Sequence, residues 1–245
     1  MSAWWQDFMA DFRFVFLEND RWQLLFQGLG NTLVITFFAV LIGIGLGAVV
    51  ATVRTTYDKN QEDLKKRNPV GYYVLYVCNL ICQIYLTVIR GTPVVVQLMI
   101  SYFIIFAASN NSIAVAIFAF GINSGAYVAE IFRSGIMSID KGQMEAGRSL
   151  GLGYAKTMQK IILPQAIKNV LPALVNEMIT LLKETSICGY IGLNELTRGG
   201  DIIRGVTFEA LLPLLVVAAI YLAIVMFFTW VMGKLERRLR ESDNR

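Results

Sequence analysis

Histidine is absent from this 245-residue chain, and charged side chains make up only 16% of it. The absence of histidine removes the commonest metal ligand and general base in proteins, and with it most interpretations as an intramembrane metalloenzyme. The chain has three cysteines, and Cys78 and Cys82 share a helix face without further ligands, which makes a poor metal site. We therefore expect neither an enzyme active site nor a metal site.

The shortage of charge accompanies long apolar runs. Hydrophobic residues make up 56% of the chain, whereas a soluble domain is typically closer to half apolar and a quarter charged. Uncharged or nearly uncharged stretches at 30–53, 113–132 and 208–232 approach or exceed the roughly 20 residues that cross a hydrocarbon core of about 30 Å. A fourth, more polar stretch begins near Val170. We predict an all-α polytopic membrane protein.

Basic residues indicate which segments face the cytoplasm. They concentrate in 54–67, 133–168 and the tail from 233, whereas residues 1–29 and 186–207 hold only two each. Cytoplasmic segments of membrane proteins carry an excess of lysine and arginine, so the first three segments are predicted to be cytoplasmic. The net charge of +4 is thereby accounted for by topology, and no nucleic acid partner is expected.

The number of membrane crossings follows from the side of the membrane predicted for each segment. Because 54–67 and 133–168 share a side, an even number of crossings must separate them, and 113–132 supplies one. The mostly apolar stretch 69–108 would be about 60 Å long as a single helix. We predict an interfacial or steeply inclined helix over about 70–89, a break before Pro93 and a crossing over about 93–108. The total is five transmembrane helices, with the N-terminus outside and the C-terminus in the cytoplasm.

The chain divides into three parts on this scheme. Residues 1–29 are predicted to be an extracytoplasmic amphipathic segment without a cleavable signal peptide, because a basic start and an uninterrupted apolar stretch are both lacking. Residues 30–232 form the transmembrane domain, and 233–245 a basic cytoplasmic tail. Aromatic residues suited to the headgroup region recur in the first segment, namely Trp4, Trp5, Phe8, Phe12, Phe16 and Trp22.

The first long apolar stretch contains a GxxxG pair, Gly43 and Gly47. Such a pair favours close contact between two membrane helices, because small residues let the backbones approach. The alternative is that glycine is simply frequent in membrane helices.

A polar insert with helical periodicity lies within 133–168, the longest of the predicted cytoplasmic loops. We predict short helices over 144–150 and 154–163, joined by a turn in which Gly151 and Gly153 permit positive φ angles. Pro164 lies where a helix is expected to stop or kink.

The insert carries small residues that we expect to be exposed, Ala146, Gly147 and Gly151. Small side chains allow close backbone approach, so the insert suits docking into a cleft of another protein. From these residues alone, an amphipathic hairpin resting on lipid headgroups is an equal alternative.

Seven residues of the insert resemble the cytoplasmic signature of ABC-importer membrane subunits. In that family the signature is Glu-Ala-Ala, three residues, Gly, nine residues, Ile, one residue and Leu-Pro. The matching residues are Glu145, Ala146, Gly147, Gly151, Ile161, Leu163 and Pro164. All the spacings fit, and Gly147 is the single departure, since the family usually has alanine there. The resemblance implies that this loop couples the chain to an ATPase.

Further segments resemble the polar amino acid permeases of this family. They include GLGNTLVIT at 28–36, RGTPVVVQL at 90–98 and LKETSICGYIGLNELT at 182–197. Histidine, glutamine, glutamate and arginine permease subunits belong to this branch. The resemblance implies a type I ABC importer (MetI-like) fold. It also implies a multi-pass subunit of the bacterial cytoplasmic membrane that translocates a polar or charged L-amino acid.

The same resemblance implies partners. They are an ATP-binding cassette ATPase, a second permease that is identical or different, and an extracytoplasmic amino-acid-binding protein, besides membrane lipid. The chain has no GxxxxGK[ST] phosphate loop. ATP and magnesium are therefore expected on the ATPase, with no cofactor on this chain and no catalysis by it.

Polar residues inside apolar spans are costly and indicate functional sites. One group lies in the 113–132 span and consists of Asn123, Ser124, Tyr127 and Glu130; the other is Lys183, Glu184 and Thr185. An amino acid needs an acceptor for its ammonium group, for which Glu130 or Glu184 is suited, and a donor for its carboxylate, for which Lys183 is suited. Alternatively, Glu130 pairs with Arg133 or Lys183 for structural reasons or lies at the inner membrane interface.

Two other functions are compatible with parts of this pattern. One is a permease for another small solute, such as a quaternary amine or an organosulfur compound. The other is a channel or secondary transporter acting alone. A signature for an ATPase partner has no use in a stand-alone transporter, and the sequence shows no inverted repeat of the kind common in secondary transporters.

Overall fold

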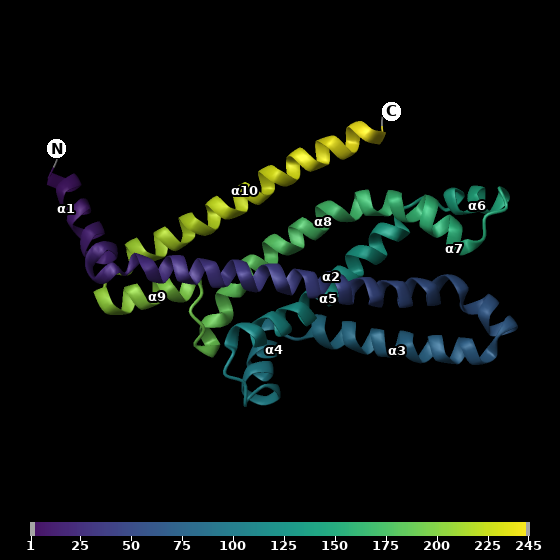
Figure 1. Cartoon of the computed structure of the whole chain (residues 1–245), viewed down its shortest axis with the longest axis horizontal. Helices are drawn as coiled ribbons and strands as arrows, with labels where there is room; N and C mark the ends of the chain where they lie inside the picture. The colour runs from purple at the N-terminus through teal and green to yellow at the C-terminus, as the bar shows by residue number, and fades with distance from the viewer. Residues whose placement is uncertain (1–2, 244–245) are drawn as a thin grey trace. The chain divides into compact units, whose positions relative to one another are not determined.

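The computed structural model describes residues 3–243, which are helical almost throughout and contain no β-strand (Figure 1). The α-helices are α1 (Ala3–Phe12), α2 (Trp22–Arg67), α3 (Pro69–Gly91), α4 (Val94–Ile100), α5 (Ser112–Met137), α6 (Lys141–Ser149), α7 (Tyr154–Thr157), α8 (Leu163–Glu184), α9 (Leu196–Thr207) and α10 (Leu211–Asp243). Short π-helical or 3₁₀ segments lie at Arg13–Leu17, Glu18–Asp20, Ser101–Ile105, Met158–Ile162 and Thr185–Ile191. The all-α prediction is confirmed.

Within the described residues, four helices are long and apolar enough to cross a membrane. They are Trp22–Lys59, Pro69–Gly91, Ser112–Met137 and Leu211–Arg238. Large apolar side chains are exposed along them, for example Phe26, Ile81 and Leu222. Lipid tails are a favourable environment for such side chains, so the exposed surface agrees with a membrane protein.

The stretch 69–108 differs in one respect from the prediction. The helix breaks where expected, between Gly91 and Val94. However, the 23-residue α3 is the part long enough to cross, and the helical stretch Val94–Ile105 is only about 18 Å long. A complete crossing by 93–108 alone is therefore wrong, because the chain leaves the helix again at Phe106, where φ is −112° and ψ is 32°.

The chain forms two compact units, which are described separately. Unit 1 comprises 1–38, 95–119 and 179–231, and unit 2 comprises 39–94, 120–178 and 232–245. The core of unit 1 consists of buried apolar side chains from the π-helical turn, the start of α2, α9 and α10. They are Val15, Phe16, Leu25, Leu196, Ile203 and Val217.

The N-terminal segment contributes to this core. Phe16, predicted to face lipid headgroups, is buried because the π-helical turn Arg13–Leu17 packs against α9. Trp22 is exposed, with 40% of its surface accessible. The side chains of Trp4 and Trp5 lie outside the described residues.

In unit 2, the GxxxG pair of α2 packs against α5. A Cβ atom on Gly43 would lie 2.9 Å from Ser124 Oγ, and one on Gly47 would lie 2.6 Å from Val128 Cγ1. Both distances are below ordinary van der Waals contact, so the close helix contact predicted from GxxxG is confirmed.

The second half of α2 and α3 form an antiparallel hairpin in unit 2 (Figure 1). Asn68 caps α3 by accepting a hydrogen bond from Gly71 N at 3.0 Å, and Pro69 fits the first helical turn because that position needs no N–H. The rings of Tyr57 and Tyr72 stack at 6.5 Å across the hairpin. These contacts fix the register in which α2 faces α3.

Candidate functional site: a polar loop and two charged clefts

The polar insert forms two short helical stretches, as predicted. The first, α6, starts at Lys141, three residues earlier than predicted, because the Asp140 side chain caps it by accepting from Gly142 N at 2.6 Å. The second consists of α7 and the π-helical turn Met158–Ile162. Gly151 between them has a φ of +81°, which confirms its predicted role in the turn. Gly153 has an ordinary φ of −68° and precedes α7.

Gly147 differs from the prediction, because it is buried rather than exposed. It faces Thr157 and Ile161, so that α6 and the second helical stretch lie in contact. A Cβ atom there would overlap Thr157 Cγ2 and would lie 3.0 Å from Thr157 Oγ1 and 3.1 Å from Ile161 Cδ1. The departure from the usual alanine therefore fits the bulk of Thr157.

This contact predicts that alanine at position 147 is tolerated only when position 157 is smaller. Gly147→Ala should lower the free energy of unfolding by about 1–3 kcal/mol through overpacking. A gain of about 1 kcal/mol in helix propensity offsets part of this loss. In a Thr157→Ser background, which removes Cγ2 and keeps the hydroxyl that donates to Gly153 O at 3.2 Å, the same change should cost less. A double-mutant cycle of melting temperatures measures the coupling. Equal costs in both backgrounds would contradict the contact.

The other signature residues divide into exposed and packed positions. Glu145, Ala146 and Gly151 are exposed, and Leu150 is 80% exposed. Ile161 is partly buried against Gly147. Pro164, expected where a helix stops or kinks, is the second residue of α8, directly after the π-helical turn Met158–Ile162 ends.

A cluster of charges surrounds Glu130 of α5 in unit 2. Glu130 Oε1 lies 3.3 Å from Arg133 Nη2, and Glu130 Oε2 lies 3.9 Å from Arg90 Nη1 of α3. Arg133 also pairs with Asp58 of α2, at 3.5 Å. Glu130 therefore pairs with Arg133, which was the structural alternative to a role in substrate binding. All four side chains keep about a third or more of their surface exposed, so these pairs hold local geometry more than they add stability.

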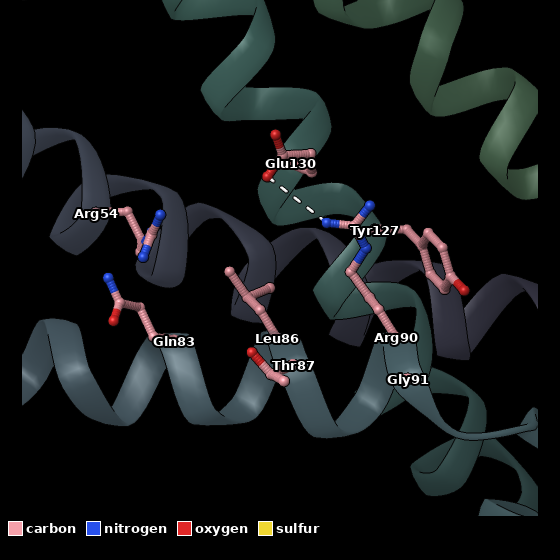
Figure 2. Close-up of a pocket in the computed structure, with 8 residues that line it drawn as sticks. All are labelled: Arg54, Gln83, Leu86, Thr87, Arg90, Gly91, Tyr127 and Glu130. Atoms are coloured by element: carbon pink, nitrogen blue, oxygen red, sulfur yellow. Dashed lines mark ion pairs between the residues drawn. The ribbon is translucent and has the colours of Figure 1, made fainter.

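Two open clefts adjoin this cluster. The first, here the arginine cleft, has a volume of about 630 Å³ and is lined by Arg54, Gln83, Thr87, Arg90, Tyr127 and Glu130, among others (Figure 2). The second, here the glutamate cleft, has a volume of about 570 Å³ and is lined by Arg90, Tyr127, Glu130, Ser134, Asn169 and Glu177, among others. Arg90, Tyr127 and Glu130 thus form a wall common to both. The guanidinium of Arg90 lies 5.7 Å from the centre of the Tyr127 ring, a cation–π contact that holds it in this wall.

The structure brings part of the predicted pathway residues together. Tyr127 and Glu130 line both clefts, and the buried Ser124 donates a hydrogen bond to Glu177 Oε1 at 2.8 Å. Asn123 is also buried.

The other three predicted residues belong to unit 1. Thr185 is buried and donates to Leu182 O at 2.8 Å, and Lys183 is exposed. Glu184 is partly buried.

The site also contains three residues that were not predicted from the sequence, Arg54, Asp58 and Arg90. Arg54 and Asp58 were assigned to a cytoplasmic segment, and Arg90 to a helix break. A signal was available, because ionisable residues at the edges of apolar stretches are candidates for partners of Glu130.

Unit 1 contains a second polar centre, at Glu195, which has no exposed surface. Its carboxylate caps α9 by accepting from Thr197 N at 2.8 Å and Arg198 N at 2.6 Å, and it accepts from the Tyr221 hydroxyl of α10 at 3.2 Å. Next to it, Leu196 N donates to Thr32 Oγ1 of α2 at 3.3 Å. Glu195 and Leu196 together thus join α9, α10 and α2 within unit 1. Burial raises the pKa of its carboxyl above the ordinary value, although the hydrogen bonds it accepts act in the opposite direction.

The raised pKa of Glu195 predicts a pH dependence. The folded state binds the proton more tightly than the unfolded state, so protonation of Glu195 stabilises the fold. This contribution is present at pH values below the ordinary glutamate range and is lost as pH rises through the raised pKa. Melting temperatures of the purified transporter across that range should show the decline. Glu195→Gln should flatten it, and an unchanged profile in the variant would exclude Glu195 as its source.

Residues 66–241 match the family described as binding-protein-dependent transport system inner membrane components. The match covers well over half of the chain, which therefore belongs to this family. It is a multi-pass inner-membrane permease and a non-catalytic component of an importer. Transport that depends on a binding protein implies such a protein and an ATPase as partners. A channel or secondary transporter acting alone is inconsistent with this family.

Known relatives are similar over nearly the whole chain. The arginine transport system permease protein ArtQ of Bacillus subtilis (strain 168) is 36% identical over 222 residues, which are 89% of this chain and 94% of ArtQ. The glutamine transport system permease protein GlnP of Escherichia coli (strain K12) is 36% identical over 221 residues, 89% of this chain and 93% of GlnP. These similarities confirm the predicted family of polar amino acid permeases.

Solved structures show the same fold. A crystal structure of an amino acid ABC transporter with histidines contains a chain that is 40% identical, with a TM-score of 0.77, covering 91% of this chain and 98% of that one. An inward-facing structure of the MetNI methionine ABC transporter has a TM-score of 0.71 at 19% identity, covering 89% and 96%. The second likeness shows the fold alone, and it confirms the predicted MetI-like architecture.

Proposed function

We propose that this chain is the permease subunit of an ATP-driven importer for a polar or charged L-amino acid of the arginine, glutamine or histidine kind. The supporting observation is that relatives named for arginine and glutamine transport are 36% identical over about nine-tenths of both chains. The likeness to a methionine transporter is at 19% identity, so it gives no support to an organosulfur compound as the solute.

The chain crosses the membrane five times in this proposal, through α2, α3, α5, α8 and α10. The 22-residue α8 is about 33 Å long, which is sufficient for a crossing, and its polar residues explain its lower hydropathy. Five crossings place the basic segments 54–67, 133–168 and 233–245 in the cytoplasm and residues 1–29 outside. The transmembrane domain is 30–232, and the helix of α10 continues into the tail.

The ATPase docks on the loop 133–168 in this proposal. Glu145, Ala146, Leu150 and Gly151 present an exposed surface, while the contact between Gly147 and Thr157 keeps α6 fixed to the second helical stretch. A stiff loop can transmit closure of the ATPase pair to α5 and α8, between which it lies in the sequence, as a rigid-body movement. ATP and magnesium bind to the ATPase, and a second permease, identical or different, completes the pathway.

The substrate pathway runs along the clefts of unit 2 in this proposal. Glu130 and Glu177 offer carboxylates for the ammonium group of an amino acid, and Ser124 holds Glu177 in place. Asn123 and Tyr127 belong to the same helix as Glu130. Lys183 and Glu184 at the C-terminal end of α8, with Thr185 directly after it, remain proposed as pathway residues of unit 1.

Reconstitution tests the proposed function. The permease, its ATPase and its binding protein are placed in liposomes, and uptake of labelled L-arginine, L-glutamine and L-histidine is measured with and without ATP. We expect uptake of at least one of them that requires both ATP and the binding protein. Uptake of none of the three, by a complex that hydrolyses ATP, would contradict the proposal.

A further inference from the structure

The charged side chains near Glu130 form a chain of alternating sign across three helices of unit 2. Asp58 Oδ2 of α2 lies 3.5 Å from Arg133 Nη1 of α5, and Arg133 Nη2 lies 3.3 Å from Glu130 Oε1. Glu130 Oε2 in turn lies 3.9 Å from Arg90 Nη1 of α3, the ion pair drawn in Figure 2. Arg133 contacts two carboxylates, so its position affects where both of them lie.

The Arg133 guanidinium is held through its two terminal nitrogens. Each of them contacts a different carboxylate, whereas the Nε atom is buried and has no hydrogen-bond partner in the described structure. The rigid fork of a guanidinium suits this arrangement, and the compact ammonium of lysine does not reproduce it. Asp58, Glu130 and Arg133 all remain partly exposed. Ion pairs of this kind are weak, so a movement of the helices can exchange one for another at little cost.

Arg133 belongs to the end of α5, where the polar loop begins. Ser138, directly after α5, donates to Gly135 O at 2.8 Å and accepts from Asn169 Nδ2 of α8 at 3.0 Å. A Cβ atom on Gly135 would overlap Val170 Cγ2 of α8. The end of α5 and the start of α8 are thus packed against each other and hold the two ends of the loop together. A movement of the loop therefore carries Arg133 with it.

The glycine contact between α2 and α5 differs in kind from the Asp58–Arg133 ion pair. At this contact a Cβ atom on Gly47 would lie 2.6 Å from Val128 Cγ1, so the two helices are already in close contact there. Asp58 and Arg133 lie further along the same two helices, toward their C-terminal ends, and are joined by a weak ion pair. The close contact suits a pivot, and the ion pair suits a link that opens and closes when α5 tilts against α2.

We propose that Arg133 is a positioning residue that couples movement of the polar loop to the wall common to the two clefts. When the ATPase pair moves the loop, Arg133 leaves Asp58 and Glu130. The released Glu130 carboxylate then closes on Arg90, whose guanidinium is held in the wall by Tyr127. The wall thereby changes between two arrangements of charge. This inference rests on the proposed function and gives Arg133 a part in transport without contact with the substrate.

The number of ATP molecules hydrolysed per amino acid imported provides the test. Both quantities are measured on the complete transporter in liposomes, with the amino acid that the wild-type importer takes up. Arg133→Gln should raise this ratio at least about fivefold, the lower end of usual coupling between sites, while ATP hydrolysis continues. Arg133→Lys should fall in between, because it keeps the charge without the fork. Asp58→Asn should act in the same direction and add little to Arg133→Gln, because both substitutions break one link.

Arg67→Gln is the matched control, because Arg67 is exposed at the end of α2 and takes part in none of these ion pairs. We expect its ratio of ATP to amino acid to equal that of the wild type. Melting temperatures show whether each variant is folded, and partly exposed ion pairs add little stability, so values close to the wild type are expected. If Arg133→Gln does not fold, Asp58→Asn and Arg133→Lys carry the test.

The outcomes separate this inference from the proposed function. If the wild-type importer takes up an amino acid and the ratio is unchanged in the Arg133 and Asp58 variants, the inference is wrong and the proposed function stands. A parallel fall of uptake and ATP hydrolysis also overturns the inference, because it indicates a purely structural role. An equal rise of the ratio in Arg67→Gln overturns it as well. If the wild-type complex hydrolyses ATP but imports none of the three amino acids, both fall.

Discussion

Gly151→Trp is expected to abolish transport and to release the ATPase from the permease. Gly151 lies at the tip of the polar loop with a φ of +81°, and a Cβ atom there would meet no other atom within 4 Å. The space around it is therefore free of other described residues, and an indole would extend into the space that the ATPase is proposed to occupy. Co-purification of the ATPase and ATP-dependent uptake in liposomes measure the two effects.

A smaller substitution separates bulk from backbone strain. Any residue with a side chain is strained at this φ, by roughly 1–2 kcal/mol, so Gly151→Ala shares the strain of the tryptophan variant without its bulk. Gly151→Asn lowers the strain, because asparagine tolerates positive φ better than most residues. We expect both to retain the ATPase. Normal uptake by Gly151→Trp would show that the docking surface lies elsewhere.

The polar loop 133–168 shows which features could be predicted from the sequence. Periodicity, charge and two glycines were sufficient to predict two short helices and a tight turn, because those features depend on neighbours along the chain. The burial of Gly147 depends on Thr157, which faces it only when the helices pack. No property of residue 147 itself indicates the size of the residue opposite, so the reason for glycine there became clear only in the structure.

The charged cluster illustrates the same limit for the site. Glu130 was recognisable because a carboxylate near the end of an apolar helix needs a partner, and Arg133, one turn away, was the partner that sequence offered. Arg90 and Asp58 reach the cluster from α3 and α2. Their approach depends on how α2 and α3 pack against α5, through contacts such as Tyr85 Oη to Ile122 O at 2.6 Å. Helix pairing of this kind leaves no local pattern.

Glu195 was missed for a different reason. In sequence it is an acidic residue in an irregular stretch between two helices, where a solvent-exposed side chain is the usual expectation. Its capping role gave no signal, because asparagine, aspartate, serine and threonine are the usual residues at that position. One signal was present nonetheless, since glycine at positions 199 and 200 allows close packing of α9. A Cβ atom on Gly199 would lie 2.7 Å from Leu24 O.

Gly28→Ala is expected to destabilise unit 1, whereas Gly30→Ala on the same helix is not. A Cβ atom on Gly28 would lie 2.6 Å from both the carbonyl carbon and the oxygen of Glu195 and 2.9 Å from Leu196 N. These are backbone atoms and have no rotamer to adopt, so the start of α9 would have to shift. That shift would strain the hydrogen bond from Asn31 Nδ2 to Asn194 O, which is 2.7 Å long. We expect a cost of about 1–3 kcal/mol, rising for Gly28→Val.

Gly30→Ala is the control for Gly28→Ala. A Cβ atom on Gly30 would meet no described residue beyond its own helix within 4 Å, and both glycines lie within α2. Replacement by alanine gains about 1 kcal/mol of helix propensity at either position, so the difference between the two variants isolates the contact with Glu195. Melting temperatures of the purified transporter should fall for Gly28→Ala and stay level or rise for Gly30→Ala. Equal melting of the two variants would mean that α9 does not lie against α2 at Gly28.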